Sequence, residues 1–180
     1  FLIQHYGGPT RLLDWSKNPV VALFVALDLK KDKAENAIVY LLSPTVLSDY
    51  AFKEIDNHDK NNARILYPGE DYTDNWIDNL INKNNLIPKS PIALLPAYSD
   101  KRIISQHSCF TLFGERKNGF FKDEKPITCT CCERKIINKI IIDGNSVDKL
   151  LKQLKQIGIS SENIYPGLEG LIKDLNYEYK

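Results

Sequence analysis

The chain has 180 residues, 43% of them hydrophobic, so it is long enough to bury a sizeable core in one domain. Its 24 lysines and arginines nearly balance 23 aspartates and glutamates, which argues against nucleic acid as a partner. No apolar run approaches the ~20 residues that a membrane-spanning helix needs, and no signal segment is recognisable. These features predict a single-domain, cytoplasmic protein without a membrane partner.

A short strand is expected at Thr10–Trp15, directly after Gly7-Gly8-Pro9, where two glycines free the backbone and a proline lacks an amide hydrogen. Because side chains alternate along a strand, this segment should have two faces. One face carries Arg11, Leu13 and Trp15, and the other carries Thr10, Leu12 and Asp14. Only one of these faces could line a pocket.

An apolar helix and an apolar strand are expected next. Val20–Leu29 is apolar nearly all round, with Pro19 in the first turn and Ser16 or Asn18 as the N-cap, so a buried helix is predicted. Ala37–Leu42 is a continuous apolar run of strand length, which indicates a central strand covered on both sides. The order strand, helix, strand is typical of a mixed α/β domain.

The rest of the chain alternates short helices, strands and polar loops. Further helices are predicted at Ser43–Phe52, Trp76–Ile81, Ser146–Gly158 and Leu168–Leu175, and further strands at Ile92–Leu95, Cys109–Phe113 and Lys135–Ile142. Tyr98–Ser108 is expected to be a polar turn that leads into a strand. The expected fold is α/β of the α+β type, a single mixed sheet flanked by helices, the last of which covers the sheet.

Four cysteines, Cys109, Cys129, Cys131 and Cys132, allow either a metal cluster or reduced thiols. The C-x-C-C run lacks the two-residue spacer with which a zinc knuckle turns two thiolates towards one ion, and no C-x-x-C pair follows it. Adjacent cysteines in a strand would also point to opposite faces. We therefore expect ordinary reduced thiols and no metal.

The segment from His5 to Trp15 gathers an imidazole, a phenol, a guanidinium, a carboxylate and an indole. The planar donors of Arg11 can clamp a pyrophosphate, and Tyr6 or Trp15 can stack on an adenine or nicotinamide ring. His5 can donate to a ribose hydroxyl or move a proton near neutral pH. Such a concentration of different polar chemistries favours function over packing.

Structural roles remain open for the same residues. Arg11 and Asp14 could form an ion pair that locks the turn, and Trp15 could be a core ring. His5 could satisfy backbone groups of the turn. Gln106, with the histidine after it, could cap the strand that follows.

The run HYGGPTRLLDWSKNPVVALFVAL, which begins at His5, resembles the heart of the FRG domain family, where His-Tyr-Gly, Pro-Thr-Arg-Leu-Leu-Asp-Trp and an apolar Asn-Pro helix follow one another. Residues 102–114 and 163–175 are similar to later stretches of that family. The chain does not contain the family's Phe/Tyr-Arg-Gly motif. The resemblance thus implies one FRG-like domain over residues 1–180, with its first strand upstream of Phe1.

The FRG architecture looks distantly like the ADP-ribosyltransferase fold, in which three strand segments surround NAD. The resemblance implies that Thr10–Trp15 with its helix is the second segment and that Gln106 lies near the third. It implies catalytic roles for Arg11, Asp14 and Gln106, and nucleotide-binding roles for His5, Tyr6, Thr10 and Trp15. Because Gln106 carries no charge, Asp14 or Glu115 would have to stabilise the oxocarbenium-like transition state.

The function implied by the resemblance is that of a nucleotide-binding domain that takes NAD as its substrate. It would act as an ADP-ribosyltransferase or an NAD glycohydrolase, of the kind that a bacterial defence or toxin system uses. The alternative is a non-catalytic recognition module, which binds a peptide or a nucleotide and acts through a protein partner.

Overall fold

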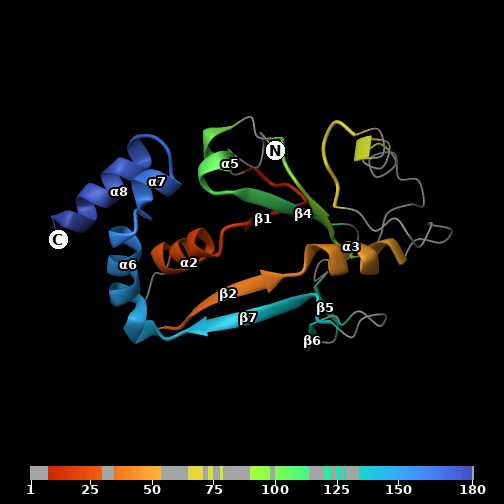
Figure 1. Cartoon of the computed structure of the whole chain (residues 1–180), viewed down its shortest axis with the longest axis horizontal. Coiled ribbons are helices and arrows are strands. Elements are labelled where there is room, and N and C mark those ends of the chain that lie inside the picture. Colours follow the sequence, from red (N-terminus) through yellow and green to blue (C-terminus); the bar gives the residue numbers. More distant parts are fainter. Residues whose placement is uncertain are drawn as a thin grey trace. The chain divides into compact units, whose positions relative to one another are not determined.

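The computed structural model describes residues 8–29, 35–53, 65–70, 73–74, 78, 90–97, 100–113, 120–122, 125–126, 128 and 134–179. Helices and strands alternate along these residues, so the fold class is mixed α+β (Figure 1). The chain divides into two compact units. Unit 1 comprises Phe1–Asp14, Leu41–Ala97 and Cys109–Asn138, and unit 2 comprises Trp15–Tyr40, Tyr98–Ser108 and Lys139–Lys180.

The strands pair in separate small sheets among the described residues, which corrects the predicted single mixed sheet. One sheet has the order β1 (Leu12–Ser16), β4 (Ser108–Leu112), β3 (Ile92–Leu94). A second pairs β2 (Ala37–Leu42) with β7 (Ile137–Ile142), and a third pairs β5 (Phe121–Lys122) with β6 (Lys125–Pro126). Local apolar patterns locate strands, but they do not say which strands pair.

Backbone hydrogen bonds fix the direction of the first sheet. β3 and β4 are antiparallel, with Ala93 opposite Thr111. The Phe113 amide donates to the Arg11 carbonyl at 2.8 Å, and the Lys17 amide donates to the His107 carbonyl at 3.0 Å. The partner of Arg11 is Phe113 and the partner of Lys17 is His107, so residue numbers rise along β1 as they fall along β4. The two strands are therefore antiparallel as well. This pairing brings the predicted motif strand beside the segment that follows Gln106.

The prediction of a central, doubly covered strand at Ala37–Leu42 was wrong. In the described part of the chain β2 pairs with β7 alone, and the two strands run in opposite directions (Figure 1). Tyr40 and Leu41, which point to opposite faces by alternation, are each 44% exposed. A two-stranded ribbon leaves side chains on both faces partly in solvent, so a continuous apolar run does not prove burial.

The predicted buried helix is α2 (Pro19–Asp28), and it supplies the core of unit 2. Asn18 is its N-cap, with Oδ1 accepting from the Val20 amide at 2.9 Å, and Pro19 occupies the first turn. Side chains spaced three residues apart point inwards and pack against α6 (Val147–Gln156). The buried members of this core are Val21, Phe24, Leu27, Ala37, Val147, Leu154, Ile164 and Tyr165.

Unit 1 has its own apolar core beneath the first sheet. Helix α3 (Pro44–Lys53), which matches the predicted helix, contacts β3. The buried members of this core are Ala51, Phe52, Leu66, Ile92, Leu94 and Phe110, with Leu12 and Leu112 packed against them. This core therefore contacts β1, the strand of the motif, through Leu12.

The carboxyl-terminal helices agree with expectation in one respect and depart from it in another. Helix α6 ends at the predicted glycine, since Gly158 has a φ of 81°, a left-handed conformation that favours glycine. Helix α8 (Leu168–Glu178) contacts the short α7 (Ser161–Ile164), but Leu168 is 75% and Ile172 is 54% exposed. The expectation that this helix buries its apolar side against a sheet was wrong.

Two short helices, α5 (Lys101–Ser105) and α7, were not predicted, and several predictions concern residues without a description. α5 begins at Asp100, whose carboxylate accepts from the Arg102 amide at 2.7 Å, where a polar turn was expected. The predicted lead-in Phe1–Tyr6, the helix Trp76–Ile81 apart from Asp78, and three of the four cysteines lie outside the described residues. Across the described ranges, no helix is long and apolar enough to cross a membrane.

Candidate functional site

The predicted motif begins in a bend and only then becomes a strand. β1 starts at Leu12, because Thr10 Oγ1 accepts a hydrogen bond from the Leu12 amide at 3.3 Å and closes a local turn. Arg11 lies in this bend, so the alternation predicted for Thr10–Trp15 does not apply to it. Leu12 packs on the core of unit 1, whereas Asp14 is exposed.

The guanidinium of Arg11 is presented to solvent. The residue is exposed, and its backbone carbonyl accepts a hydrogen bond from the Phe113 amide. Among the described residues its side chain forms no ion pair or hydrogen bond, so the structural pair between Arg11 and Asp14 is not formed there. An anion in solution can therefore approach Arg11 without displacing a protein carboxylate from that part of the chain.

Gln106 is the C-cap of α5, two residues before β4. Within unit 2, Ser16 Oγ donates to the Gln106 carbonyl at 2.7 Å. The Gln106 Nε2 donates to the Ile164 carbonyl at 3.2 Å, while no described residue donates to its Oε1. The end of the motif strand and Gln106 are thus joined, and the side-chain carbonyl of Gln106 keeps its capacity to accept a hydrogen bond.

A bend in the backbone follows directly after Gln106. His107 has a φ of 49°, a left-handed conformation that is uncommon for residues other than glycine. Its carbonyl accepts from the Lys17 amide, so the bend is held by the strand that it meets. The alternative role of Gln106 and His107, capping the next strand, is therefore compatible with their backbone contacts.

The other predicted site residues are divided between the units or lie outside the description. Thr10, Arg11 and Asp14 belong to unit 1, and Trp15, half-buried, belongs to unit 2 with Gln106. His5 and Tyr6 lie outside the described residues. Convergence of these side chains on one nucleotide pocket stays a prediction.

Ser16 is an anchor that the sequence pattern left ambiguous. Both Ser16 and Asn18 are residues that cap helices, but a helix has one N-cap, and Asn18 fills that position. Ser16 instead accepts from the Asn18 amide at 3.1 Å and donates to Gln106. The sequence offered Ser16 and Asn18 as N-caps for one helix. This surplus was the signal that one of the two side chains would have another role.

Tyr165 is a second polar group of unit 2 that the sequence did not single out. The residue is 7% exposed, with its ring centroid 4.1 Å from Lys173 Nζ and 5.8 Å from Arg102 Cζ. Burial, followed by the negative charge of Asp28, raises the pKa of Tyr165 to about 12. Asp28 also acts on the phenol proton as a hydrogen-bond acceptor would, although the buried hydroxyl makes no full hydrogen bond in the described part of the protein.

The described residues contain no group of three or more His, Cys, Asp or Glu side chains that could hold a metal ion. Cys109 is half-buried, and the other cysteines lie outside the description. The prediction of reduced thiols at Cys129, Cys131 and Cys132 therefore stays a prediction.

Comparison with known proteins identifies a family over the first part of the chain. Residues 1–35 match the FRG domain. This match contains the motif strand β1 and helix α2, and it confirms the resemblance for that segment. Residues 102–114 and 163–175 lie outside the match. No curated protein and no solved structure matches the chain.

Proposed function

We propose that this chain, whose residues 1–35 match the FRG domain, is a nucleotide-binding domain with an ADP-ribosyltransferase-like fold that consumes NAD. The observation that carries the proposal is the 2.7 Å hydrogen bond from Ser16 to the Gln106 carbonyl. It joins the end of the motif strand to the glutamine expected at the third segment of such a site. A strand that leads directly into the apolar helix α2 gives further support.

The exposed side chains suggest a division of roles. Arg11 would bind the pyrophosphate of NAD, because a planar guanidinium can donate two parallel hydrogen bonds to phosphate oxygens. The Oε1 of Gln106 would accept a hydrogen bond from a ribose hydroxyl. Asp14, which is exposed, would supply the negative charge that Gln106 lacks.

The proposed reaction breaks the bond between ribose C1′ and the nicotinamide nitrogen, and both bonding electrons leave with nicotinamide. The ribose then passes through an oxocarbenium-like state that a nearby carboxylate stabilises. Water or an acceptor nucleophile forms the new bond to C1′ and loses a proton. The products are nicotinamide and either free ADP-ribose or an ADP-ribosylated acceptor.

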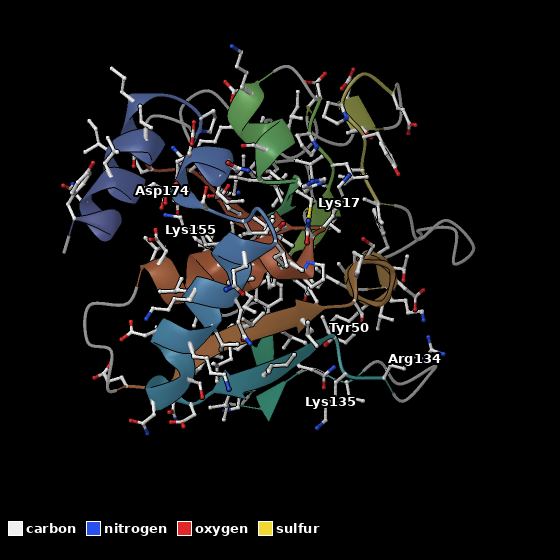
Figure 2. All side chains as sticks on the ribbon, turned by 60° about the vertical axis from the view of Figure 1, so that its left-hand side comes forward. Lys17, Tyr50, Arg134, Lys135, Lys155 and Asp174 are labelled. Carbon is white, nitrogen blue, oxygen red and sulfur yellow. The ribbon has the colours of Figure 1, made fainter. Side chains whose placement is uncertain are left out.

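The proposal is tested by incubating the chain with NAD and measuring nicotinamide release by chromatography. Binding is measured in parallel as the change in melting temperature with NAD. We expect Arg11→Ala to weaken binding about 10- to 100-fold, the loss of one charge-assisted pair, while the melting temperature without ligand stays unchanged. Arg134→Ala, an exposed arginine outside the motif, is the matched control and should bind like the parent (Figure 2).

A binding module without turnover is the second candidate function. It is favoured by the hydrogen bond that commits Gln106 Nε2 to the Ile164 carbonyl and by the absence of charge on that side chain. This candidate predicts that NAD or a peptide raises the melting temperature while no nicotinamide appears. If NAD produces neither turnover nor a change in melting temperature, the NAD proposal is wrong.

A further inference from the structure

Helix α8, which lies beside α7, turns its apolar side to solvent (Figure 1). Its exposed large hydrophobic residues recur at helical spacing, so they form one stripe along the helix and its C-cap. The members of this α8 stripe are Leu168, Leu171, Ile172, Leu175 and Tyr179, with exposures from 39% at Leu171 to 87% at Tyr179. A helix on the surface of a globular protein normally buries its apolar stripe, so an exposed one indicates an interface.

Contacts with α7 fix the rotation of α8 about its own axis. A Cβ at Gly170 would collide with the backbone carbonyl oxygens of Ser161 and Tyr165, so this glycine packs directly on backbone. Both carboxylate oxygens of Asp174 accept backbone hydrogen bonds, from the Ser161 amide at 3.2 Å and the Glu162 amide at 2.8 Å. Gly170 and Asp174 lie on the far side of the helix from the centre of the α8 stripe. Rotating the stripe inwards would break these contacts.

The spacing of the four stripe residues within the helix reads the same in both directions. Leu168 and Leu171 are three residues apart, Ile172 follows directly, and Leu175 is three residues further on. A twofold axis perpendicular to the helix, between Leu171 and Ile172, would place Leu171 opposite the Ile172 of a second copy. The same axis would place Leu168 opposite Leu175. The α8 stripe is therefore self-complementary, as a symmetric dimer interface requires.

The area of the α8 stripe suits a weak dimer. Its exposed fractions amount to about three whole residues, on the order of 500 Å² of apolar surface at about 150–250 Å² for a large side chain. Exposed polar neighbours, Glu169 and Asn176, would add a rim. A standard interface covers about 800 Å² on each partner, and a weak one less than about 600 Å². We therefore expect reversible pairing rather than a permanent dimer.

A lipid surface fits the α8 stripe less well than a second copy does. A helix that lies on a membrane usually carries lysines and arginines on its polar side. By sequence α8 has three acidic residues and one basic residue, Lys173, whose Nζ already lies 3.2 Å from Glu169 Oε1. Anionic lipid headgroups would repel such a helix.

We propose that the α8 stripe is a homodimer interface, in which the α8 helices of two copies pack antiparallel about a twofold axis between Leu171 and Ile172. The pairing buries the four apolar side chains of each helix against the same four side chains of its partner. It uses none of the residues assigned to NAD.

The test is sedimentation equilibrium of the whole chain at concentrations from about 1 to about 500 µM. We expect a monomer–dimer equilibrium with a Kd on the order of 10–100 µM. Leu171→Lys and Ile172→Glu should each raise this Kd at least about ten-fold, because each would bury a charge at the axis. Ile157→Lys is the matched control, since this isoleucine of unit 2 is exposed but lies outside α8, and it should dimerise like the parent.

A mixture of the two variants tests the register of the helices. Equal amounts of Leu171→Lys and Ile172→Glu should form a heterodimer at least about ten-fold tighter than either variant forms alone, because the introduced ammonium and carboxylate groups would face each other. Both positions are exposed, so each variant should keep the melting temperature and far-ultraviolet spectrum of the parent at about 1 µM, where all are monomers.

A parent that stays monomeric at the highest concentration would overturn the proposal, as would a dimer that neither substitution weakens. Mixed variants that associate no better than each alone would show that the register is wrong. Co-sedimentation of the parent with vesicles of phosphatidylcholine and phosphatidylserine, lost in Ile172→Glu, would assign the α8 stripe to a lipid surface and also overturn the proposal. These readouts do not involve NAD, so this inference and the proposed function fail separately.

Discussion

At the scale of single residues, the raised pKa of the Tyr165 phenol makes the stability of the fold depend on pH in the alkaline range. Burial and the charge of Asp28 raise its pKa from near 10 to about 12. The unfolded chain therefore loses this proton at a lower pH than the folded chain does. The associated stability is fully present below pH 10 and is lost as pH rises from 10 towards 12.

We expect the free energy of unfolding to fall by up to about 2–3 kcal/mol more in the parent than in Tyr165→Phe between pH 9 and 12. Urea unfolding at several pH values measures this difference. Tyr179→Phe is the control, because Tyr179 is 87% exposed and should keep the steep decline. Parallel pH profiles for the parent and Tyr165→Phe would show that the phenol titrates normally.

The residue scale also shows how far the sequence could define the site. It predicted a cluster of polar groups at His5–Trp15 and a third segment of the site near Gln106. The hydrogen bond from Ser16 joins the end of the first segment to Gln106, while a site shared by the two stays a prediction. It could not predict that Thr10 would close a turn over Arg11, because one side-chain hydrogen bond decides between bend and strand there. Tyr165 gave no signal, since its burial depends on helices far along the chain.

At the scale of elements, Gly170 allows α8 to lie directly on the backbone of α7. A Cβ at this position would collide with the carbonyl oxygens of Tyr165 and Ser161 and come within 2.9 Å of the Glu162 Cα. These are backbone atoms, which cannot swing aside as a flexible side chain does. The two helices would have to separate.

Gly170→Ala should therefore lower the free energy of unfolding by about 1–3 kcal/mol, although alanine is the better helix former by about 1 kcal/mol. Chemical denaturation followed by circular dichroism measures the change. Asn176→Ala, at an exposed position of the same helix, should be neutral or slightly stabilising. A stabilising effect of Gly170→Ala would mean that α7 and α8 are not in such close contact.

The sequence predicted the helices that have a clear cap, an apolar stripe or a stop residue. Helix α2 has a proline, a cap and a buried stripe, and α6 has a stripe that stops at a glycine. The five residues of α5 are too few to show a helical period, so only its Asp100 cap could have signalled it. The pairing of β1 with β4 depends on contacts between distant parts of the chain, which local patterns do not contain.

At the scale of the whole molecule, the order of the predicted strands and helices sufficed to predict the mixed class, but not how the core is divided. Each of the two units has a separate set of buried apolar residues. Of the five points at which the chain passes from one unit to the other, four fall within strands, namely β1, β2, β4 and β7. A domain boundary normally lies in an exposed connection that few contacts cross.

Strands that continue from one unit into the other should make the units unfold together, as the single-domain prediction requires. We expect one calorimetric transition whose calorimetric and van't Hoff enthalpies agree. Ile92→Ala in the core of unit 1 and Leu154→Ala in the core of unit 2 should each cost about 2–5 kcal/mol. Each should lower the melting temperature of that same transition, whereas Lys152→Ala at the surface should not. Two transitions, with each core variant lowering the melting temperature of only one, would instead define two domains. The part of each shared strand in one unit would then unfold while the part in the other unit stayed folded.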